Sequence, residues 1–554
     1  MKPIKSALPG SRQGVVKTNI VKANIEKISS EKNNAVKAIN DKLAETVKNS
    51  FLATVKSGLL AIVLAMTSVQ AMAVSELNVA QGYDPQNLDP IDTFRLSWGA
   101  IGSNIFEGLV QRGEDLQLVP GLATGWEFSD DDSRIRFTLR EGVSFHNGEP
   151  FNAAAVKYTF DRLLGEQGKK GPQRSNYTSI ESIEIVDDYT VDFVMNKVDP
   201  VLITKLAGYG AMIVPPKYIE EVGEEAFDRQ PVGTGPYQVV SYEPSVDLKL
   251  KRFDDYWNGM AKTELVNIRF ISEPATRMAE LMSGGVDISL HVPNTAVETL
   301  KKNNSVDLVS VTGPTVNMMR FKANDSITED VRVREAINVA IDRDAILQSL
   351  LGGLGETIAS AQGELSFGYD ANITQYSYDP AKAKSLLNAA GIAPGTQIVL
   401  DITNNDDTFR EISQVVASYL GMVGLNLKIR SNESNIMSSD LIPNGKTGEL
   451  FQFGWGGWTF DFDNTAYLLY HSGERFNPYI HDAKLDELLD KQRSTYDRGI
   501  REQALQDVAG YIRDNHLEVP LFNLVTMYGV SKKVTGFVPA PDDRVRYMNV
   551  EVTD

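Results

Sequence analysis

The chain has 554 residues, more than one hydrophobic core usually supports, so two or more domains are expected. Its apolar fraction of 42% and charged fraction of 23% are those of a globular protein. It contains no cysteine, which excludes thiol catalysis, disulfides, Cys-ligated metal sites and a lipidated N-terminal Cys.

The charge is distributed unevenly along the chain. Residues 1–73 carry a net charge of +7, and the remaining residues carry a net charge of −25. A body this acidic repels nucleic acids and anionic lipid surfaces, so we expect neither as a partner.

Residues 56–73 have the features of a secretory signal. Lys56 precedes an apolar run from Gly58 to Val69, and the segment ends in Ala71-Met72-Ala73, which fits an A-x-A cleavage site. The apolar run is too short to span a bilayer comfortably. We therefore expect cleavage after Ala73 and no membrane insertion of the mature chain; the alternative is an uncleaved anchor helix.

Residues 1–46 form a much longer leader than an ordinary basic n-region. We expect that translation starts further along, at a non-Met codon near Val47, Leu52 or Val55, so that residues 1–46 are not translated. Residues 1–73 are excluded from the fold prediction.

The first half of the mature chain alternates between strand and helix patterns. Asn152 is placed to cap a helix that continues to Leu163. Strands are predicted at 77–80, 135–139, 183–193 (as a hairpin), 246–252 and 266–271, and helices at 96–108, 152–163 and 273–283. This alternation indicates α/β layers.

A second region begins near residue 312. Helices are predicted at 331–351, 379–390, 408–423, 483–491 and 500–514, and strands at 397–402 and 425–429. The β-prone segments 306–311 and 519–525 lie at the two ends of this region, so we expect them to be crossing strands.

Residues 451–464 carry the most distinctive chemistry. Six aromatic residues surround the pair Gly456-Gly457, and the stretch ends in Asp461, Asp463 and Asn464. Apolar groups with a few polar ones are typical of a small-molecule pocket, and the alternative is a buried strand followed by a capped turn.

Asp461 and Asp463 have three possible roles. Two residues apart, they could act as acid and base, ligate a hard cation or contact a ligand. The alternative is that Asp463 or Asn464 caps a short helix over residues 467–470.

Other catalytic motifs are absent from the sequence. There is no G-x-S-x-G, no P-loop and no H-E-x-x-H or H-x-x-x-H pair. The five histidines are His146, His291, His471, His481 and His516. We expect no catalytic residues, no metal site and no cofactor.

The segment 140–156, Arg-Glu-Gly-Val-Ser-Phe-His-Asn-Gly-Glu-Pro-Phe-Asn-Ala-Ala-Ala-Val, is specific. It closely resembles the segment that marks family 5 of the extracytoplasmic solute-binding proteins, the dipeptide, oligopeptide, nickel and glutathione type. The resemblance continues in order along the mature chain at 87–90, 106–110, 231–237, 331–343 and 378–383.

This resemblance implies a two-lobed α/β fold of the periplasmic-binding-protein type, with an extra subdomain in the first lobe and a hinge of two crossing strands. It implies a first lobe at 74–312, a second lobe at 313–522 and a return to the first lobe at 523–554. It also implies a monomeric, non-enzymatic, periplasmic receptor that delivers a solute to an ABC permease and its ATPase. Ligand contacts to both lobes form only when the hinge is shut, so binding shifts the open–closed population.

The resemblance also places ligand contacts. Peptide-binding members hold the ligand amino group with an aspartate shortly after a Gly-Trp pair, and at that place this sequence has Trp458. Dipeptide-type members carry an arginine ahead of the helix corresponding to 409–423; here 401–408 contains none, and the nearest is Arg410. A simple dipeptide held at both ends is therefore not the expected ligand.

The expected contacts are of other kinds. Trp455 or Trp458 can stack on a ligand or make a cation–π contact. Asp461, Asp463 or Asn464 can supply polar contacts from a shifted position, and Tyr83 can approach from the opposite lobe.

The predicted ligand is peptide-like or another small polar organic solute. The alternatives are a nickel or metal-chelate receptor and, in a different class, a secreted hydrolase using Asp461 and Asp463.

Overall fold

The computed structural model describes Lys37, Lys42 and residues 75–553 apart from Phe94, Glu114 and Asn405. The chain divides into two units, Met1–Ala73 and Val74–Asp554, and the fold below is that of the second. The signal segment, its cleavage site and the late translation start lie outside the described residues, so they remain predictions. Across the described part of the chain, no helix combines the length and apolarity needed to cross a membrane.

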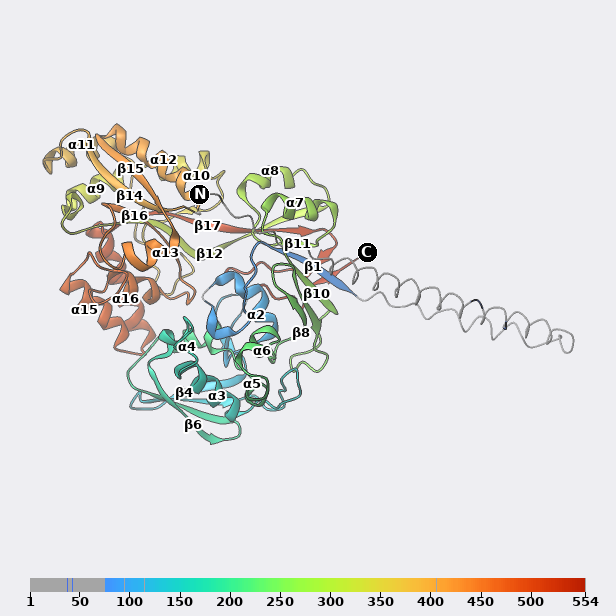
Figure 1. Cartoon of the computed structure of the whole chain (residues 1–554). Helices are drawn as coiled ribbons and strands as arrows, with labels where there is room; N and C mark the ends of the chain where they lie inside the picture. Colours follow the sequence, from blue (N-terminus) through green and yellow to red (C-terminus); the bar gives the residue numbers. More distant parts are fainter. Residues whose placement is uncertain are drawn as a thin grey trace, which may run out of the picture. The chain divides into compact units, whose positions relative to one another are not determined.

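A mixed sheet of 11 strands extends through both halves of the second unit (Figure 1). Its members in spatial order are β15 (Leu425–Asn432), β14 (Thr396–Thr403), β16 (Leu450–Gly456), β12 (Val306–Phe321), β17 (Glu518–Ser531), β11 (Ile288–Ser289), β1 (Glu76–Gln81), β10 (Leu265–Phe270), β9 (Asp247–Arg252) and β8 (Tyr237–Glu243), with β13 (Glu356–Thr357) pairing to β17. The predicted strands are all present.

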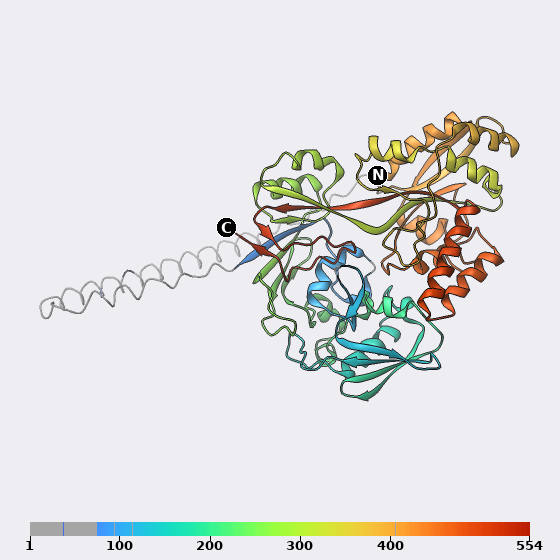
Figure 2. The same ribbon diagram turned by 180° about the vertical axis from the view of Figure 1, so that it is seen from behind.

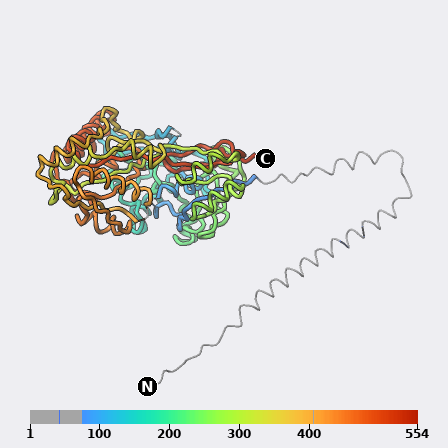
Figure 3. The backbone as a smooth tube through the Cα atoms, turned by 90° about the horizontal axis from the view of Figure 1, so that it is seen from above, coloured from blue at the N-terminus to red at the C-terminus, as the bar shows by residue number. Residues whose placement is uncertain are grey.

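The long strands β12 and β17 join the two halves of the sheet. They pair antiparallel from Val306 opposite Ser531 to Arg320 opposite Glu518, with a register shift between Thr312 and Val316. At one end β17 pairs with β11, and at the other end β12 pairs with β16. Figures 2 and 3 show the two strands side by side along their length. The predicted β-prone segments are therefore the shared strands of a two-lobed fold.

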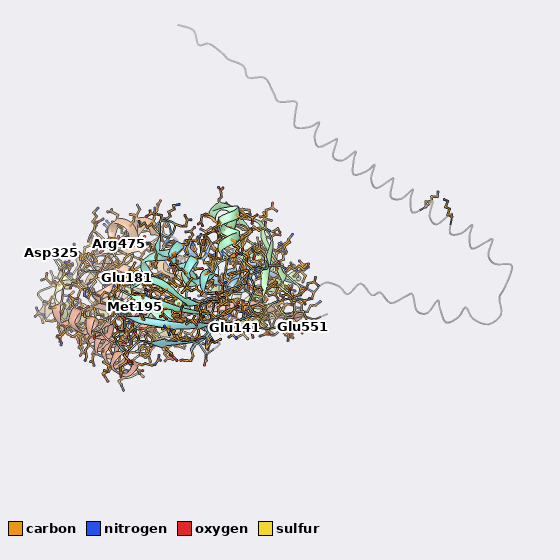
Figure 4. The ribbon with its side chains drawn as sticks, turned by 90° about the horizontal axis from the view of Figure 1, so that it is seen from below. Glu141, Glu181, Met195, Asp325, Arg475 and Glu551 are labelled. Carbon is orange, nitrogen blue, oxygen red and sulfur yellow. The ribbon has the colours of Figure 1, made fainter. Side chains whose placement is uncertain are left out.

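An extra subdomain belongs to the first lobe. A four-stranded antiparallel sheet is formed, in order, by β4 (Ala123–Phe128), β5 (Arg134–Leu139), β7 (Thr190–Met195) and β6 (Ile180–Asp187). In β5 the alternate residues Ile135, Phe137 and Leu139 are buried, as a period of two requires. The helix α3 (Ala153–Leu164) packs on β6 and β7, and Asn152 caps it as predicted. Glu181 and Met195, labelled in Figure 4, lie on β6 and β7.

The first lobe also contains short helices and strands outside these two sheets. They are η2 (Pro90–Asp92), η3 (Leu96–Trp98), α2 (Gly99–Ile105), β2 (Val110–Arg112), β3 (Leu118–Pro120), η4 (Arg174–Tyr177), α4 (Leu202–Leu206), η5 (Tyr209–Ala211), α5 (Pro216–Val222), α6 (Glu224–Arg229), α7 (Pro274–Ser283), η6 (Asn294–Ala296) and α8 (Val297–Leu300).

The C-terminal segment after β17 packs back onto the first lobe. Its strands β18 (Val534–Thr535) and β19 (Glu551–Val552) pair with each other. The side-chain amide of the buried Asn104, on α2, donates to Val545 O at 2.8 Å and its oxygen accepts from Tyr547 N at 2.9 Å. These bonds fix the segment before β19 against α2.

Two groups of helices pack around the sheet in the second lobe. The first comprises α9 (Val331–Val339), α10 (Arg343–Ser349), α11 (Pro380–Ala389) and α12 (Asp407–Met422), and the second comprises α14 (Phe462–Tyr470), α15 (Ala483–Arg493) and α16 (Arg498–Asp514).

The prediction of one continuous helix over 331–351 was wrong. The chain breaks between α9 and α10, where Asp342 accepts a hydrogen bond from Ala345 N at 2.9 Å and so caps a new helix. The buried Arg343 donates through Nε to Pro520 O at 2.5 Å, which anchors the break to β17. The apolar face at Ile337 and Ile341 continues across the break, so periodicity alone did not reveal it.

Candidate ligand-binding site

The aromatic stretch 451–464 folds as a strand, a tight turn and a capped helix. Gly456 ends β16 opposite Thr315 on β12. The turn that follows contains Trp458 and Phe460, whose φ is +50°, and Asp461 then begins α14. The pocket-lining and buried-strand interpretations therefore describe neighbouring parts of one segment.

A cavity of about 400 Å³ opens at this turn. It lies where three distant parts of the chain meet, and its size is that of a small-molecule site. Its lining residues are Arg95, Leu96, Ser97, Thr315, Gly456, Trp458 and Asp543.

Trp458 is half-buried and forms one wall of this cavity. Its ring lies against Gly208 of the first lobe, where a Cβ would come within 2.6 Å of Cζ3. The contact therefore depends on the absence of a side chain at Gly208. The role of Trp458 as a ligand contact remains a prediction, and the structure gives it a suitable place.

Trp455 and Asn464 hold each other. Trp455 Nε1 donates to Asn464 Oδ1 at 3.0 Å, and the indole stacks on Phe453 with the ring centroids 5.7 Å apart. Neither Trp455 nor Asn464 is among the residues that line the cavity. Their contact with a ligand stays a prediction, and their visible role is to brace β16 against α14.

Asp461 and Asp463 are engaged in buried ion pairs. Asp461 receives two hydrogen bonds from Arg501, at 2.9 and 3.0 Å. Asp463 receives two from Arg493, at 2.7 and 2.9 Å, and one from Gln492. Asp461 is also the N-cap of α14, accepting from Asp463 N at 3.0 Å, so the prediction that Asp463 or Asn464 is the cap was wrong.

The two carboxyl groups shift their pKa in opposite directions. Burial raises the pKa of Asp461 in spite of Arg501. For Asp463, burial also acts upward, but the charge and hydrogen bonds of Arg493 outweigh it and lower the pKa. With Arg501 and Arg493 as partners, the pair is built to hold the turn, which opposes a role as acid, base or cation ligand.

Tyr83 and Arg410 have different positions. The guanidinium of Arg95 lies 4.3 Å from the centre of the Tyr83 ring, so Tyr83 supports a residue that lines the cavity. Arg410, on α12, pairs with the exposed Asp407 at 2.7 Å and donates to Asn404 O, and it is not a lining residue. Both remain predictions as ligand contacts, with Tyr83 the better placed.

The sequence predictions missed the two charged residues that line the cavity, Arg95 and Asp543. Asp543 adopts a left-handed conformation, with φ +59°. Its Oδ1 accepts from Tyr528 OH at 3.3 Å and pairs with His291 Nε2 at 3.1 Å. Burial acts to lower the pKa of His291, but the hydrogen bond and charge of Asp543 outweigh it, so the pKa is raised. A single cavity thus presents a guanidinium and a carboxylate.

No local motif marks Arg95 or Asp543, because the fold brings them together from opposite ends of the chain. Within the described residues, no group of three or more His, Asp or Glu side chains is arranged to hold a metal ion.

Comparison with known proteins identifies the family to which this chain belongs. Residues 117–477 match the family described as bacterial extracellular solute-binding proteins, family 5 Middle. The match spans more than half of the chain, and the chain belongs to this family.

Individual relatives agree. The glutathione-binding protein GsiB of Pectobacterium atrosepticum is 27% identical over 508 residues, covering 89% of this chain and 97% of its own. The structure of AgaA from A. tumefaciens R10 with agropinic acid is 27% identical, with a TM-score of 0.71 and coverage of 86% and 99%. The structure of NikA from Brucella suis with Fe(III)-EDTA is 22% identical, with a TM-score of 0.79 and coverage of 86% and 100%, which supports the fold.

These findings define the class. The chain is a substrate-binding component of an ABC importer, and proteins of this class bind a small ligand or peptide and deliver it to a permease. The family consists of transport proteins rather than enzymes.

Proposed function

We propose that the chain is a monomeric periplasmic receptor that captures a peptide-like or other small polar organic solute in the cavity at Trp458. The bound form is recognised by a permease, whose ATPase supplies the energy of import. One relative is named as a glutathione-binding protein, and another was solved in complex with agropinic acid. Both support the proposal that the ligand is a small organic solute.

The cavity itself carries this proposal. Its lining comes from the segment before α2, from the paired strands β12 and β16 and from the C-terminal segment. A ligand there touches both sides of the hinge made by β12 and β17, so binding free energy favours the closed form.

Arg95 and Asp543 refine the expected ligand. A peptide-like solute carries an ammonium and a carboxylate, and the cavity offers a counter-charge for each. Trp458 supplies an apolar face for the rest of the molecule. The missing aspartate after the Gly-Trp pair is thus balanced by a carboxylate from another part of the chain.

Contacts between the lobes give closure a structural basis. Arg112 in the first lobe donates to Thr459 O in the second, and the hydroxyl of Tyr496 accepts from Asp199 N at 3.3 Å. The rings of Phe128 and Tyr496 lie 4.5 Å apart. Each contact joins the two lobes and is lost when they separate.

A thermal-shift screen tests the proposal. Peptides, glutathione, opines, sugars and metal chelates are added to the purified chain, and a true ligand raises the melting temperature because it binds only the folded form. The stabilisation is about 2.7 kcal/mol at a hundredfold excess over the dissociation constant. If none of the organic solutes stabilises the chain, the proposal fails.

The second candidate is a receptor for nickel or a metal chelate. The described residues form no cluster able to ligate a metal, so the metal would enter within its chelator. Metal content measured after loading with free nickel and with nickel–histidine separates the two candidates. A secreted hydrolase is disfavoured by the ion pairs of Asp461 and Asp463, and turnover of a solute that disappears in Asp461→Asn would reverse that judgement.

A further inference from the structure

A second cavity, of about 270 Å³, lies within the first lobe. Three arginines line it: Arg112 at the end of β2, and Arg544 and Arg546 on the C-terminal segment. The bonds of Asn104 to Val545 and Tyr547 hold that segment in place, so the two tail arginines are positioned by a buried anchor.

Arg544 has unused hydrogen-bonding capacity inside the protein. Only 8% of the residue is exposed, and its Nη1 donates to Ala207 O. Its Nε is buried and makes no hydrogen bond among the described residues, although it forms an ion pair with Asp542 Oδ2 at 3.4 Å. A buried donor without a partner costs free energy, which an incoming acceptor would recover.

The other two arginines, Arg112 and Arg546, differ in how many of their donors already make hydrogen bonds within the protein. Arg112 donates to Leu116 O at 2.8 Å and to Thr459 O, so its role includes holding the backbone. Arg546 is exposed, and within the described part of the chain it donates one hydrogen bond, from Nη2 to Arg112 O at 3.1 Å. Most of its donors are therefore available to a ligand.

The carboxylates of this cavity do not neutralise the three arginines. Glu107 accepts hydrogen bonds from four side chains: Tyr256, Trp257, Thr234 and Gln111. Asp542 pairs with Arg544 at 3.4 Å, and its charge also acts on Arg112 and Arg546, so three guanidinium groups share this carboxylate. Burial and the charge of Arg544 lower the pKa of Arg112 to about 10 and also lower the pKa of Arg546. The cluster is therefore a place where an anion relieves repulsion between cations.

The two cavities adjoin at Trp458. Gly208 lines the arginine cavity. The ring of Trp458 packs against Gly208 and lines the cavity at the turn after β16. In the C-terminal segment, Asp542 and Arg544 line one cavity and Asp543 between them lines the other. The two cavities therefore lie on either side of the contact between Trp458 and Gly208.

We propose that Arg544 and Arg546 form an anion subsite for a carboxylate of the transported solute, whose remainder occupies the cavity at Trp458. This rests on the proposed function and narrows it to peptide-like solutes that carry an additional carboxylate. Charge-assisted hydrogen bonds to a buried guanidinium discriminate an acid from its amide by ~10-fold or more.

Calorimetric titration with paired probes tests the subsite. Glutathione is compared with its C-terminal amide, and the dipeptide Ala-Glu with Ala-Gln, on wild type, Arg546→Gln and Arg252→Gln. The matched control Arg252 also bonds one backbone oxygen, Ala261 O, but does not line the cavity. Arg546 is preferred to Arg544 because it is exposed, so its replacement leaves the core intact.

The expected result is a preference for the acid in wild type and in Arg252→Gln that disappears in Arg546→Gln. Equal binding of acid and amide by wild type would overturn the proposal. A preference that survives in Arg546→Gln would overturn it as well.

Crystals of the purified chain soaked in selenate provide an independent arm. The proposal predicts an anomalous peak within hydrogen-bonding distance of Arg544 and Arg546. A peak there without any acid preference would mean a site for free inorganic anions and would overturn the assignment to the solute. A peak there with no binding of any organic solute would overturn the proposed function instead, and the absence of both peak and preference would overturn the subsite.

Discussion

At the scale of single residues, Trp458 is the side chain that carries most of the proposed ligand site, because it forms a wall of the cavity. We expect Trp458→Ala to weaken solute binding by ~10-fold to 100-fold, because an aromatic wall of the cavity is lost. Because the ring is half-buried and packs on Gly208, we also expect a modest loss of unfolding free energy. Trp126→Ala, at a half-buried tryptophan of β4, is the matched control. Equal loss of affinity in both variants would contradict a specific role for Trp458.

His291 gives the site a dependence on pH. Its partner Asp543 raises its pKa, and Arg277 is the cation that opposes this. The stabilisation from protonated His291 is therefore complete below its unfolded pKa of about 6.5 and is lost as pH rises through the higher folded pKa. The difference in unfolding free energy between wild type and His291→Gln should be larger at about pH 5.5 than at about pH 9. A difference that is constant with pH would show that His291 does not titrate with Asp543.

Some residues of the candidate site could be predicted from the sequence, and others could not. Trp458 could be proposed from its distance to Gly454-Trp455; it lines a cavity, and its contact with a ligand stays a prediction. Arg95, Asp543 and Arg544 could not, because their neighbourhood is created by the C-terminal segment folding back onto α2. Asp461 and Asp463 were visible as a pair, but the sequence does not show that Arg501 and Arg493 on later helices neutralise them.

At the scale of elements, the turn between β16 and α14 depends on the buried pair Asp461–Arg501. We expect Asp461→Asn to lower the unfolding free energy by about 3–5 kcal/mol, because Arg501 is left buried without a counter-charge. Asp497→Asn, at the exposed cap of α16, should be nearly neutral because Asn caps a helix as well as Asp. Urea denaturation compares the two variants, and a loss below 1 kcal/mol in Asp461→Asn would contradict the structural role.

The segment between α4 and η5 contains Gly208, against which the ring of Trp458 packs. A Cβ at this position would also lie 2.8 Å from Lys205 O, so Gly208→Ala must move the indole or the backbone. We expect weaker solute binding, measured by calorimetry, because the lobes close less completely. Gly510→Ala on α16, where a Cβ meets nothing within 4 Å, should bind normally and be slightly more stable. Normal binding by Gly208→Ala would show that the contact is not needed for closure.

Elements were predicted well where one hydrophobic period was strong and ended clearly. The helix after Asn152 and the strand at 135–139 are examples. The break at Asp342 was missed because the apolar face continues through it, whereas the Asp342 cap and the bond of Arg343 to β17 together explain the break.

At the scale of the whole molecule, β12 and β17 are the shared elements, and the boundaries at 74–312, 313–522 and 523–554 remain a prediction. The chain has no cysteine, so single cysteines can be introduced at chosen positions and labelled specifically with spin labels. Glu181, on β6 of the first lobe, and Arg475, after α14 in the second lobe, are both exposed and are labelled in Figure 4.

Ligand binding should shorten or narrow the distance distribution between spin labels at Glu181→Cys and Arg475→Cys. A pair at Glu141→Cys and Glu181→Cys, both in the first lobe, serves as the control and should not change. A distribution that ligand leaves unaltered would contradict hinged closure.

The central claim is that the chain is a solute receptor whose ligand lies against Trp458. Isothermal titration of the purified chain with the best solute from the thermal-shift screen tests it most directly. The account predicts binding of one molecule per chain, recovery of the solute unchanged, and an affinity at least ~10-fold weaker in Trp458→Ala than in Trp126→Ala. Conversion of the solute, or equal affinity in wild type and Trp458→Ala, would contradict it.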